Sequence, residues 1–416
     1  MNDDLCVMTA DPHGLRAFLL ELGRELSLAG AAVTETQDRL NRVAAANGAT
    51  DARIVVLPTT LMIAVGWARE TTIEAVPQRA GTLRLDQIAV LYDIVQDAER
   101  GAVGPGEGLR RLAAMRDMRP RRGRLSTVGW YAVMTAGLCL ILQPTGLDVA
   151  IAAGFGALVG LLIPLRSGRH TIGVLVPVLS ATVVSALTFV AVKYGVADPG
   201  LRTLIAPLTT FLPGGVLTTA TVELASGEMV AGASRLVFGA LQLLLLAFGI
   251  VAGAEIAGLP RADAVHDAPA NLLGWWAPWL GVLVYGVGAA AYFSAPRGAL
   301  RWLLLVLFTA WAGQRLGNVV VGANVSGFVG ALVMTPVALA VARLRGGPPS
   351  QVTFLPAFWL LVPGAIGLIG VTEVVGDPGS AGLQNLVQPM AAIVAIALGV
   401  LCGTALYRGL RSLLDK

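Results

Sequence analysis

Two glutamates and two proline-glycine pairs recur at one fixed distance along the chain. Pro213-Gly214 is followed by Glu223, ten residues beyond the proline, and Pro363-Gly364 is followed in the same way by Glu373. The two copies are 150 residues apart, because 363 − 213 and 373 − 223 give the same number. Each copy lies in an apolar run, where a carboxylate is costly and is by default a candidate for ion binding or proton transfer.

The proline-glycine pair predicts a broken helix with free backbone groups. Proline removes an N–H donor and clashes with the preceding turn, and glycine loosens the backbone. Such a break frees carbonyls on the upstream half-helix and exposes N–H groups at the start of the downstream half-helix. The carbonyls attract a cation and the N–H groups attract a carboxylate, so the geometry suits a zwitterion such as an amino acid.

Threonines surround the first break and could hydrogen-bond a hydroxylated ligand. They are Thr209, Thr210, Thr218, Thr219 and Thr221. The alternative is that they satisfy backbone groups freed by the kink. The second copy has Gly-Leu-Ile at 367–369 where the first has Leu-Thr-Thr at 217–219. We therefore expect the first break to hold the ligand and the second to act as its counterpart and gate. The residues expected to bind the ligand are Thr210, Pro213, Gly214, Gly215, Thr218, Thr219, Pro363 and Gly364.

Composition places these breaks in a membrane protein. Hydrophobic residues make up 55% of the chain and charged residues only 13%, with a mean hydropathy of +0.72, whereas soluble domains carry about 25% charged residues. Residues 1–124 hold 32 of the 56 charged residues, which leaves 24 for the other 292. The pattern predicts a polar N-terminal domain followed by a membrane domain. The three cysteines lack metal-ligand or redox spacing, so we expect no metal and no cofactor.

The N-terminal domain, over residues 12–118, is predicted to be a small α+β domain. Helical patterns cover 12–47, with a break at Gly30-Ala31, and 84–116. Residues 53–66 read as two strands around a Pro-Thr-Thr turn, and Thr71–Val76 as a third. A regulatory or gating role is the expectation. An enzymatic role would need a catalytic cluster in this segment, and the sequence offers none.

Ten apolar spans follow a basic cluster at Arg116–Arg124. The predicted spans are 126–143, 148–165, 171–192, 203–224, 235–257, 272–293, 299–314, 319–341, 353–375 and 387–408. With the N-terminus inside, 15 basic residues fall on the cytoplasmic side and 4 on the external side. This asymmetry predicts that both termini are cytoplasmic.

Ten spans divide into two halves of five, at 125–258 and 272–408. Span 4 matches span 9 through the proline-glycine pair, and Gly129-Trp130-Tyr131-Ala132 echoes Gly274-Trp275-Trp276-Ala277 at an offset of 145. A unit with an odd number of spans returns in the opposite orientation, so the sequence predicts a 5+5 inverted repeat. Inversion places Glu223 toward the cytoplasmic face and Glu373 toward the external face, where they could couple protons or gate. The alternative is that both are water-exposed, inert residues at helix ends.

Three stretches carry a family resemblance. They are Leu28-Ala29-Gly30-Ala31 with Val55-Val56-Leu57-Pro58-Thr59-Thr60, Pro213-Gly214-Gly215-Val216-Leu217-Thr218-Thr219-Ala220 with Glu223-Leu224, and Phe358-Trp359-Leu360-Leu361-Val362-Pro363-Gly364. In this order the chain resembles the bacterial threonine/serine exporter family in its fused single-chain form, from about residue 12 to 408. The resemblance implies a polytopic α-helical protein of the bacterial plasma (inner) membrane. It would export threonine or serine, driven by the proton-motive force.

The sequence leaves other functions open beside this one. Relatives of the split, two-chain form are associated with dicarboxylate export, so a dicarboxylate such as succinate is the alternative substrate. A channel would carry flux that is independent of the pH gradient. The expected partners are a small amino acid and the lipid bilayer, with no nucleic acid, and a homo-oligomer is left open.

Overall fold

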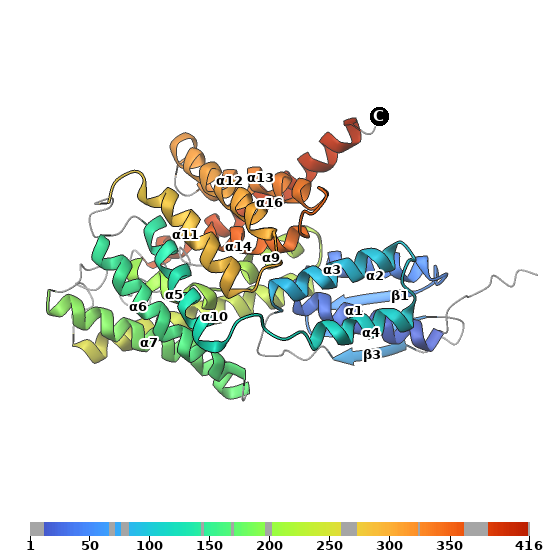
Figure 1. Ribbon diagram of the computed structural model, residues 1–416, viewed down its shortest axis with the longest axis horizontal. Helices are drawn as coiled ribbons and strands as arrows, with labels where there is room; N and C mark the ends of the chain where they lie inside the picture. The colour runs from blue at the N-terminus through green and yellow to red at the C-terminus, as the bar shows by residue number, and fades with distance from the viewer. Residues whose placement is uncertain are drawn as a thin grey trace, which may run out of the picture. The chain divides into compact units, whose positions relative to one another are not determined.

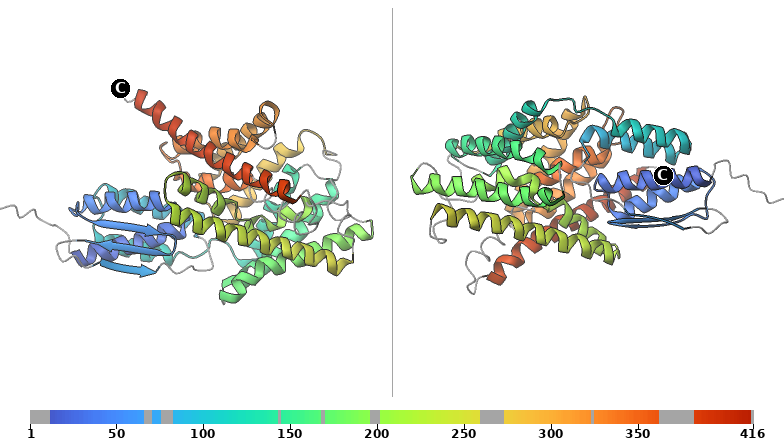
Figure 2. Two further views of the ribbon diagram at one scale, coloured as in Figure 1. Left: turned by 180° about the vertical axis from the view of Figure 1, so that it is seen from behind. Right: turned by 90° about the horizontal axis from the view of Figure 1, so that it is seen from below.

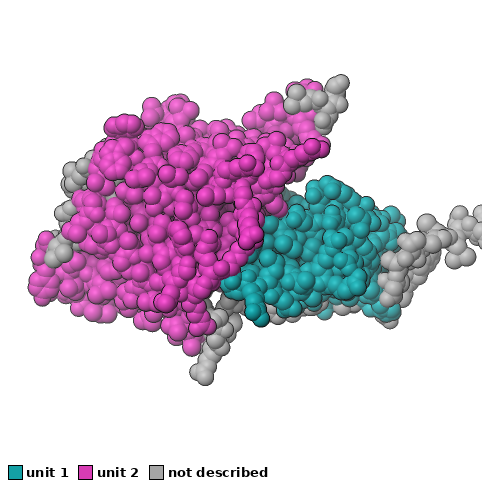
Figure 3. Space-filling model, viewed as in Figure 1, with its two compact units in different colours: residues 1–120, 223–234 teal, residues 121–222, 235–416 magenta. Residues whose placement is uncertain are grey.

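The computed structural model describes residues 12–65, 71–75, 83–142, 145–167, 170–195, 202–258, 273–322, 325–361 and 382–414. The chain forms two compact units (Figure 3). The first comprises residues 1–120 together with Glu223–Ser234, and the second comprises residues 121–222 and 235–416. The helix at residues 214–225 therefore begins in the second unit and ends in the first.

A three-stranded antiparallel sheet forms one layer of the first unit. Its strands, in spatial order, are β1 (Arg53–Leu57), β2 (Thr60–Ala64) and β3 (Thr71–Ala75). Side chains of β1 alternate between exposed and buried, with Ile54 and Val56 buried while Val55 is exposed. This alternation is typical of a sheet with one covered face, and the helices lie on that one side (Figure 2). The three predicted strands are confirmed.

Besides the helical residues within Glu223–Ser234, the described part of the first unit contains four whole helices (Figure 1). They are α1 (Pro12–Leu28), α2 (Val33–Ala46), α3 (Leu85–Glu99) and α4 (Pro105–Arg116). The predicted break at Gly30-Ala31 is confirmed, since Gly30 has a φ of 81° and ends α1 in the left-handed conformation. Pro105 occupies the first turn of α4, where its missing N–H costs no hydrogen bond.

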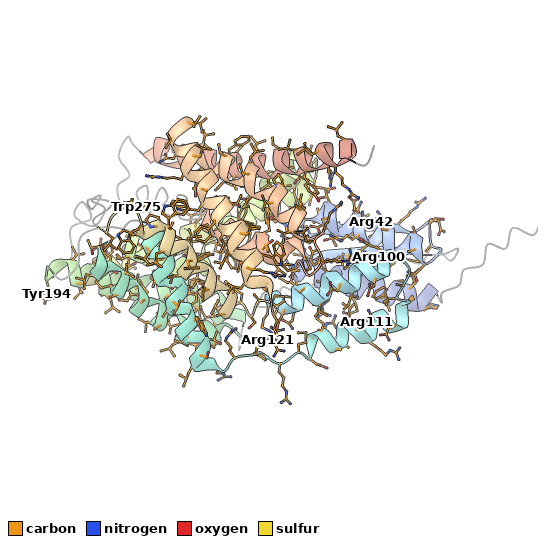
Figure 4. All side chains as sticks on the ribbon, turned by 45° about the horizontal axis from the view of Figure 1, so that its top comes forward. Arg42, Arg100, Arg111, Arg121, Tyr194 and Trp275 are labelled. Carbon is orange, nitrogen blue, oxygen red and sulfur yellow. The ribbon has the colours of Figure 1, made fainter. Side chains whose placement is uncertain are left out.

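Arg116 has a structural role in this unit beyond the basic cluster in which the sequence placed it. Its guanidinium pairs with Glu21 and Glu25 of α1, and Arg116 Nε lies 2.6 Å from Glu25 Oε1. Glu25 is buried, so the pair ties α4 to α1. By contrast, Arg42 and Arg111 lie at the surface of the unit (Figure 4).

The second unit is a bundle of apolar helices. They are α5 (Arg124–Ile141), α6 (Gly146–Leu162), η1 (Ile163–Ser167), α7 (His170–Lys193), α8 (Arg202–Leu208), η2 (Thr209–Phe211), α9 (Gly214–Ala225), α10 (Met229–Ala257), α11 (Ala277–Tyr292), α12 (Ala299–Val320), α13 (Ser326–Val341), α14 (Ser350–Leu360) and α16 (Gly382–Leu414). Helices α12, α13 and α16 lie side by side (Figures 1 and 2). The first residues of α10 belong to the first unit.

Six helices in the described part of the chain are long and apolar enough to cross a membrane, or seven if the bent pair α8–α9 is one span. Helices α11 and α13 are shorter apolar helices. The class of polytopic membrane protein is confirmed, whereas the number of ten spans stays a prediction. Two neighbouring predicted boundaries are wrong. The predicted span at 299–314 stops before Arg315, but α12 continues to Val320 because that arginine lies on an exposed face. The predicted span at 319–341 therefore starts too early, since α13 begins at Ser326.

A stripe of large apolar side chains runs along the outside of α10. Val237, Leu241, Leu244 and Phe248 recur every three or four residues, and each is about half exposed or more. Water would disfavour such a stripe, whereas lipid tails accommodate it.

Helices α5 and α11 pack closely and run antiparallel. A Cβ added at Gly281 would lie 2.9 Å from the backbone nitrogen of Ile141, and one added at Gly288 would lie 2.5 Å from that of Met134. The position on α5 falls from 141 to 134 as the position on α11 rises from 281 to 288. The first helices of the two predicted halves therefore point in opposite directions.

The pair α7–α10 and the pair α13–α16 share one packing pattern. A Cβ added at Gly249 would lie 2.8 Å from Ala181 Cβ, and one added at Gly399 would lie 2.8 Å from Ala331 Cβ. The two residues of the second contact each lie 150 positions after their counterparts in the first contact, since 399 − 249 and 331 − 181 both equal 150. Other contacts at this offset are Gly249–Val178 with Gly399–Phe328, Gly253–Ser185 with Gly403–Thr335, and Gly253–Thr182 with Gly403–Leu332. This packing has the same offset as the two proline-glycine pairs.

Candidate functional site

The first predicted break is confirmed as a sharp bend in an apolar helix pair. The segments Thr203–Phe211 and Gly214–Ala225 meet at 58°. Leu212 is extended, with a ψ of 127°, as sterics require of a residue before proline. The 3-10 turn Thr209–Phe211 therefore stops, and a new helix starts where Leu217 N donates to Pro213 O at 2.9 Å.

Two side chains from other helices bind the upstream carbonyls of this break. The Tyr131 hydroxyl of α5 donates to Pro207 O at 2.7 Å and lies 2.8 Å from Thr210 Oγ1. Gln242 Nε2 of α10 donates to Phe211 O at 2.9 Å. Phe211 is two residues before Pro213, at the end of the upstream segment. These two carbonyls thus have side-chain donors inside an apolar bundle, where unpaired groups would be costly.

The helix before the second predicted break has matching donors. The Tyr285 hydroxyl of α11 donates to Pro356 O at 3.0 Å, and Gln314 Nε2 of α12 donates to Leu361 O at 3.4 Å. Leu361 is again two residues before the proline of the pair. Pro363, Gly364 and Glu373 themselves lie outside the described residues.

The two tyrosines correct one detail of the predicted repeat. Tyr131 and Tyr285 play the same role at positions 154 apart, not 145. The Gly-Trp echo at offset 145 places Gly274–Trp276 before α11 begins, whereas its partner Gly129–Tyr131 lies inside α5. Trp275 is 80% exposed (Figure 4). Tryptophans gather at membrane interfaces irrespective of helix register, so their spacing was a poor guide to alignment.

Four of the five threonines around the first break divide into three groups, and the fifth, Thr219, is partly buried. Thr209 Oγ1 donates to Ala206 O at 2.9 Å and Thr221 Oγ1 to Leu217 O at 3.0 Å, so these two serve their own helices. Thr210 contacts Tyr131. Thr218 is buried, and its Oγ1 has no hydrogen-bond partner within the described part of the chain.

Open space lies at the start of α9. A Cβ added at Gly215 would meet no atom of the described residues within 4 Å. The first N–H groups of an α-helix have no acceptor within that helix. The start of α9 therefore offers donors beside free space, which is an arrangement that can accept a carboxylate.

Glu223 lies near the end of α9 and is fully buried, with 0% exposure. Its Oε1 accepts a hydrogen bond of 3.0 Å from the backbone N–H of Val33, the first residue of α2. Both residues belong to the first compact unit. Glu223 therefore lies near a helix end, as expected, but is not exposed to water, and its role in proton coupling or gating stays a prediction.

Sequence reasoning missed most of the side chains that hold the breaks. Tyr131 was predicted only as part of the Gly-Trp echo, Gln314 was predicted as polar lining of its span or as an interhelical hydrogen bond, and Gln242 and Tyr285 carried no prediction. The signal for all four was a large polar side chain inside an apolar span, which needs a hydrogen-bond partner in lipid. The contact between Val33 and Glu223 had no signal, because it joins residues 190 positions apart through a backbone group.

Apolar helices, one of them broken around buried polar groups, define a polytopic membrane protein, and broken helices of this kind are typical of secondary transporters. The family model for ThrE, described as "Putative threonine/serine exporter", matches residues 17–257, which is more than half of the chain. The chain belongs to this family.

Curated relatives are fungal membrane proteins. The protein named Pheromone-regulated membrane protein 10 of Candida glabrata is 22% identical over 89% of this chain and 49% of its own length. The proteins of that name from Zygosaccharomyces rouxii and Eremothecium gossypii are each 22% identical, over 96% and 65% of this chain and 43% and 38% of their own lengths. The chain thus spans half or less of these relatives. No solved structure matches it.

Proposed function

We propose that this protein is a secondary transporter that exports threonine and serine across the plasma membrane, driven by the proton-motive force. The observation that carries the proposal is the broken helix at Pro213-Gly214, in a chain of the threonine/serine exporter family. Broken helices form the substrate sites of many secondary transporters. The chemistry is binding and movement, with no enzymatic step and no cofactor.

The proposed architecture has ten spans arranged as a five-plus-five inverted repeat. Three observations support it: α5 and α11 are antiparallel, the α7–α10 contacts recur in α13–α16 at an offset of 150, and the carbonyls before both breaks have tyrosine and glutamine donors. The excess of basic residues on one side supports cytoplasmic termini in a bacterial inner membrane.

In the proposed site, the substrate carboxylate lies against the first N–H groups of α9, beside the open space at Gly215. The Thr218 hydroxyl hydrogen-bonds the hydroxyl of the substrate, because it is buried and has no other partner in the described residues. The other proposed contacts are Thr210, Pro213, Gly214, Thr219, Pro363 and Gly364. Glu223 and Glu373 are the proposed proton-coupling or gating acids.

The test is transport in proteoliposomes loaded with radiolabelled threonine, serine or succinate, with an imposed pH gradient. Threonine and serine efflux should depend on the gradient, and succinate should not move. Succinate efflux would support a dicarboxylate exporter, and efflux that is independent of the gradient would support a channel. Thr218→Val, a near-isosteric change, should weaken threonine binding about tenfold, because a buried substrate hydroxyl would lose its partner.

Glu223→Gln tests the coupling role and has a matched control. It should abolish the dependence of efflux on the pH gradient, because an amide cannot carry the proton. Glu228→Gln, five residues further along the chain, should keep that dependence. If both variants behave like the wild type, Glu223 is not a coupling group.

A further inference from the structure

The first turn of α2 is a helix start without a cap of its own. The residue before the helix is Ala32, which has no side chain that can accept a hydrogen bond, and no side-chain cap is formed there. Serine, threonine, aspartate or asparagine usually fills this position. The N–H of Val33 points instead at a carboxylate 190 residues away, Glu223 Oε1 at 3.0 Å.

This contact joins a buried carboxyl group to the positive end of a helix dipole. A helix N-terminus favours negative charge, and the effect is larger where water is excluded. Glu223 is 0% exposed and Val33 is 3% exposed. The carboxylate thus takes the place that a capping side chain would occupy.

The framework around Val33 fixes the direction of its N–H. Ala31 N donates to Leu26 O at 3.1 Å, and Gly30 has a φ of 81°, so the turn from α1 into α2 is set by the backbone. Helix α2 also packs against α1, α3 and β1. The first turn of α2 is therefore a rigid donor.

On the other side of the contact, Glu223 begins a tight turn. Its carbonyl accepts from Ser226 N at 3.1 Å and from Glu228 N at 2.9 Å, and Gly227 has a φ of 88°. This turn connects α9 to α10 and belongs to the same compact unit as α2.

We propose that the first turn of α2 positions the Glu223 carboxylate for transport, so that the N-terminal unit is part of the transport machinery and not only a regulator of it. The proposal rests on the proposed role of Glu223 in transport. Val33 acts through its backbone N–H as a positioning group, and α2 holds the end of the broken helix α9 through it.

Hydrogen exchange of the full chain in nanodiscs tests the contact without measuring transport. The N–H of the first residue of a helix has no intrahelical acceptor, so slow exchange at Val33 reports the bond to Glu223. Glu223→Ala should speed exchange in a peptide covering residues 31–36 by about tenfold, as expected for loss of one buried hydrogen bond. Glu228→Ala, in the same turn, should leave this exchange slow. Unchanged exchange in Glu223→Ala would overturn the proposal.

Substitution of Val33 tests its consequence for transport. Proline is accepted at the first position of a helix, and Ala32 already has a ψ of 151°, which suits a residue before proline. Val33→Pro therefore removes the N–H with little change in the fold. Val33→Ala shortens the same side chain but keeps the N–H. Threonine efflux per folded molecule should be at least about fivefold lower in Val33→Pro than in Val33→Ala.

The two experiments separate this proposal from the proposed function. Equal efflux in the two Val33 variants would overturn the positioning role even where threonine is transported. If the wild type moves no threonine while Glu223→Ala still speeds exchange at Val33, the contact stands and the assignment as a threonine exporter fails. In that case the efflux rates of Val33→Pro and Val33→Ala are compared with serine or succinate, whichever is transported. Equal efflux rates in the two variants would again overturn the positioning role.

Discussion

Removing one hydroxyl from each half of the second unit should have unequal effects. Tyr131 is fully buried, and its hydroxyl donates to Pro207 O and contacts Thr210 Oγ1. Tyr285 is also fully buried, and its hydroxyl donates to Pro356 O at 3.0 Å. Phenylalanine keeps the ring in both cases, so the variants change hydrogen bonding and little else.

The magnitude follows from the groups left without a partner. A buried polar group that loses its partner costs ~1–3 kcal/mol. The Thr210 hydroxyl can rotate to a carbonyl of its own helix, as Thr209 does, so most of the cost in Tyr131→Phe falls on the Pro207 carbonyl. We expect Tyr131→Phe to destabilise the bent state by about 2 kcal/mol. This free energy changes the equilibrium constant between the bent state and its alternatives about 30-fold. Tyr285→Phe should cost about 1 kcal/mol because its bond is longer and has one acceptor.

The assay is the initial rate of threonine efflux from proteoliposomes, with thermal melting of the purified protein as the measure of stability. Tyr131→Phe should reduce efflux about tenfold or more, and Tyr285→Phe by about fivefold, while both proteins stay folded. Efflux at the wild-type rate in Tyr131→Phe would refute the idea that this hydroxyl holds the break. A larger loss in Tyr285→Phe would refute the placement of the substrate at the first break.

Three further outcomes are expected. Gly253→Val should reduce the yield of folded protein, because an added Cβ would lie 2.6 Å from a side-chain atom where α10 contacts α7. Gly154→Val is the control and should not reduce the yield, because a Cβ there meets no atom of the described residues within 4 Å. Size-exclusion chromatography in detergent measures the yield of both variants. Arg116→Met should lower the unfolding free energy by about 2 kcal/mol, a value between those of exposed and buried ion pairs. Denaturant melting measures this change. Arg110→Met is the control, because the ion pair of Arg110 is largely exposed. Ser350→Cys should react with a membrane-impermeant thiol reagent only from the cytoplasmic side, and labelling from outside would contradict the proposed topology.

Part of this structure could be predicted from the chain because the causes are local. Proline cannot donate a hydrogen bond and restricts the residue before it, and the following glycine loosens the backbone, so the Pro213-Gly214 pair predicts a break. The alternation along 53–57 and the left-handed glycine at position 30 are also local, and both predictions are confirmed.

Other predictions failed or fell short where the cause was not local. The Gly-Trp echo suggested an offset of 145, but helix packing relates Tyr131 to Tyr285 at 154. Hydropathy ended a span before Arg315, although α12 runs to Val320, because hydropathy does not show which face of a helix a charge occupies. The identity of the donors to the freed carbonyls depends on which helices become neighbours, and a single sequence does not reveal that.

The sequence by itself determined the membrane class, the first break and the presence of a glutamate ten residues beyond it, since composition and proline sterics act within one segment. Only the tertiary structure decided what each polar group contacts. It brings Tyr131 and Gln242 to the carbonyls of the break and buries Glu223 against the N–H of Val33. The physical reason is that buried polar groups must find partners, and the chain brings those partners from distant segments.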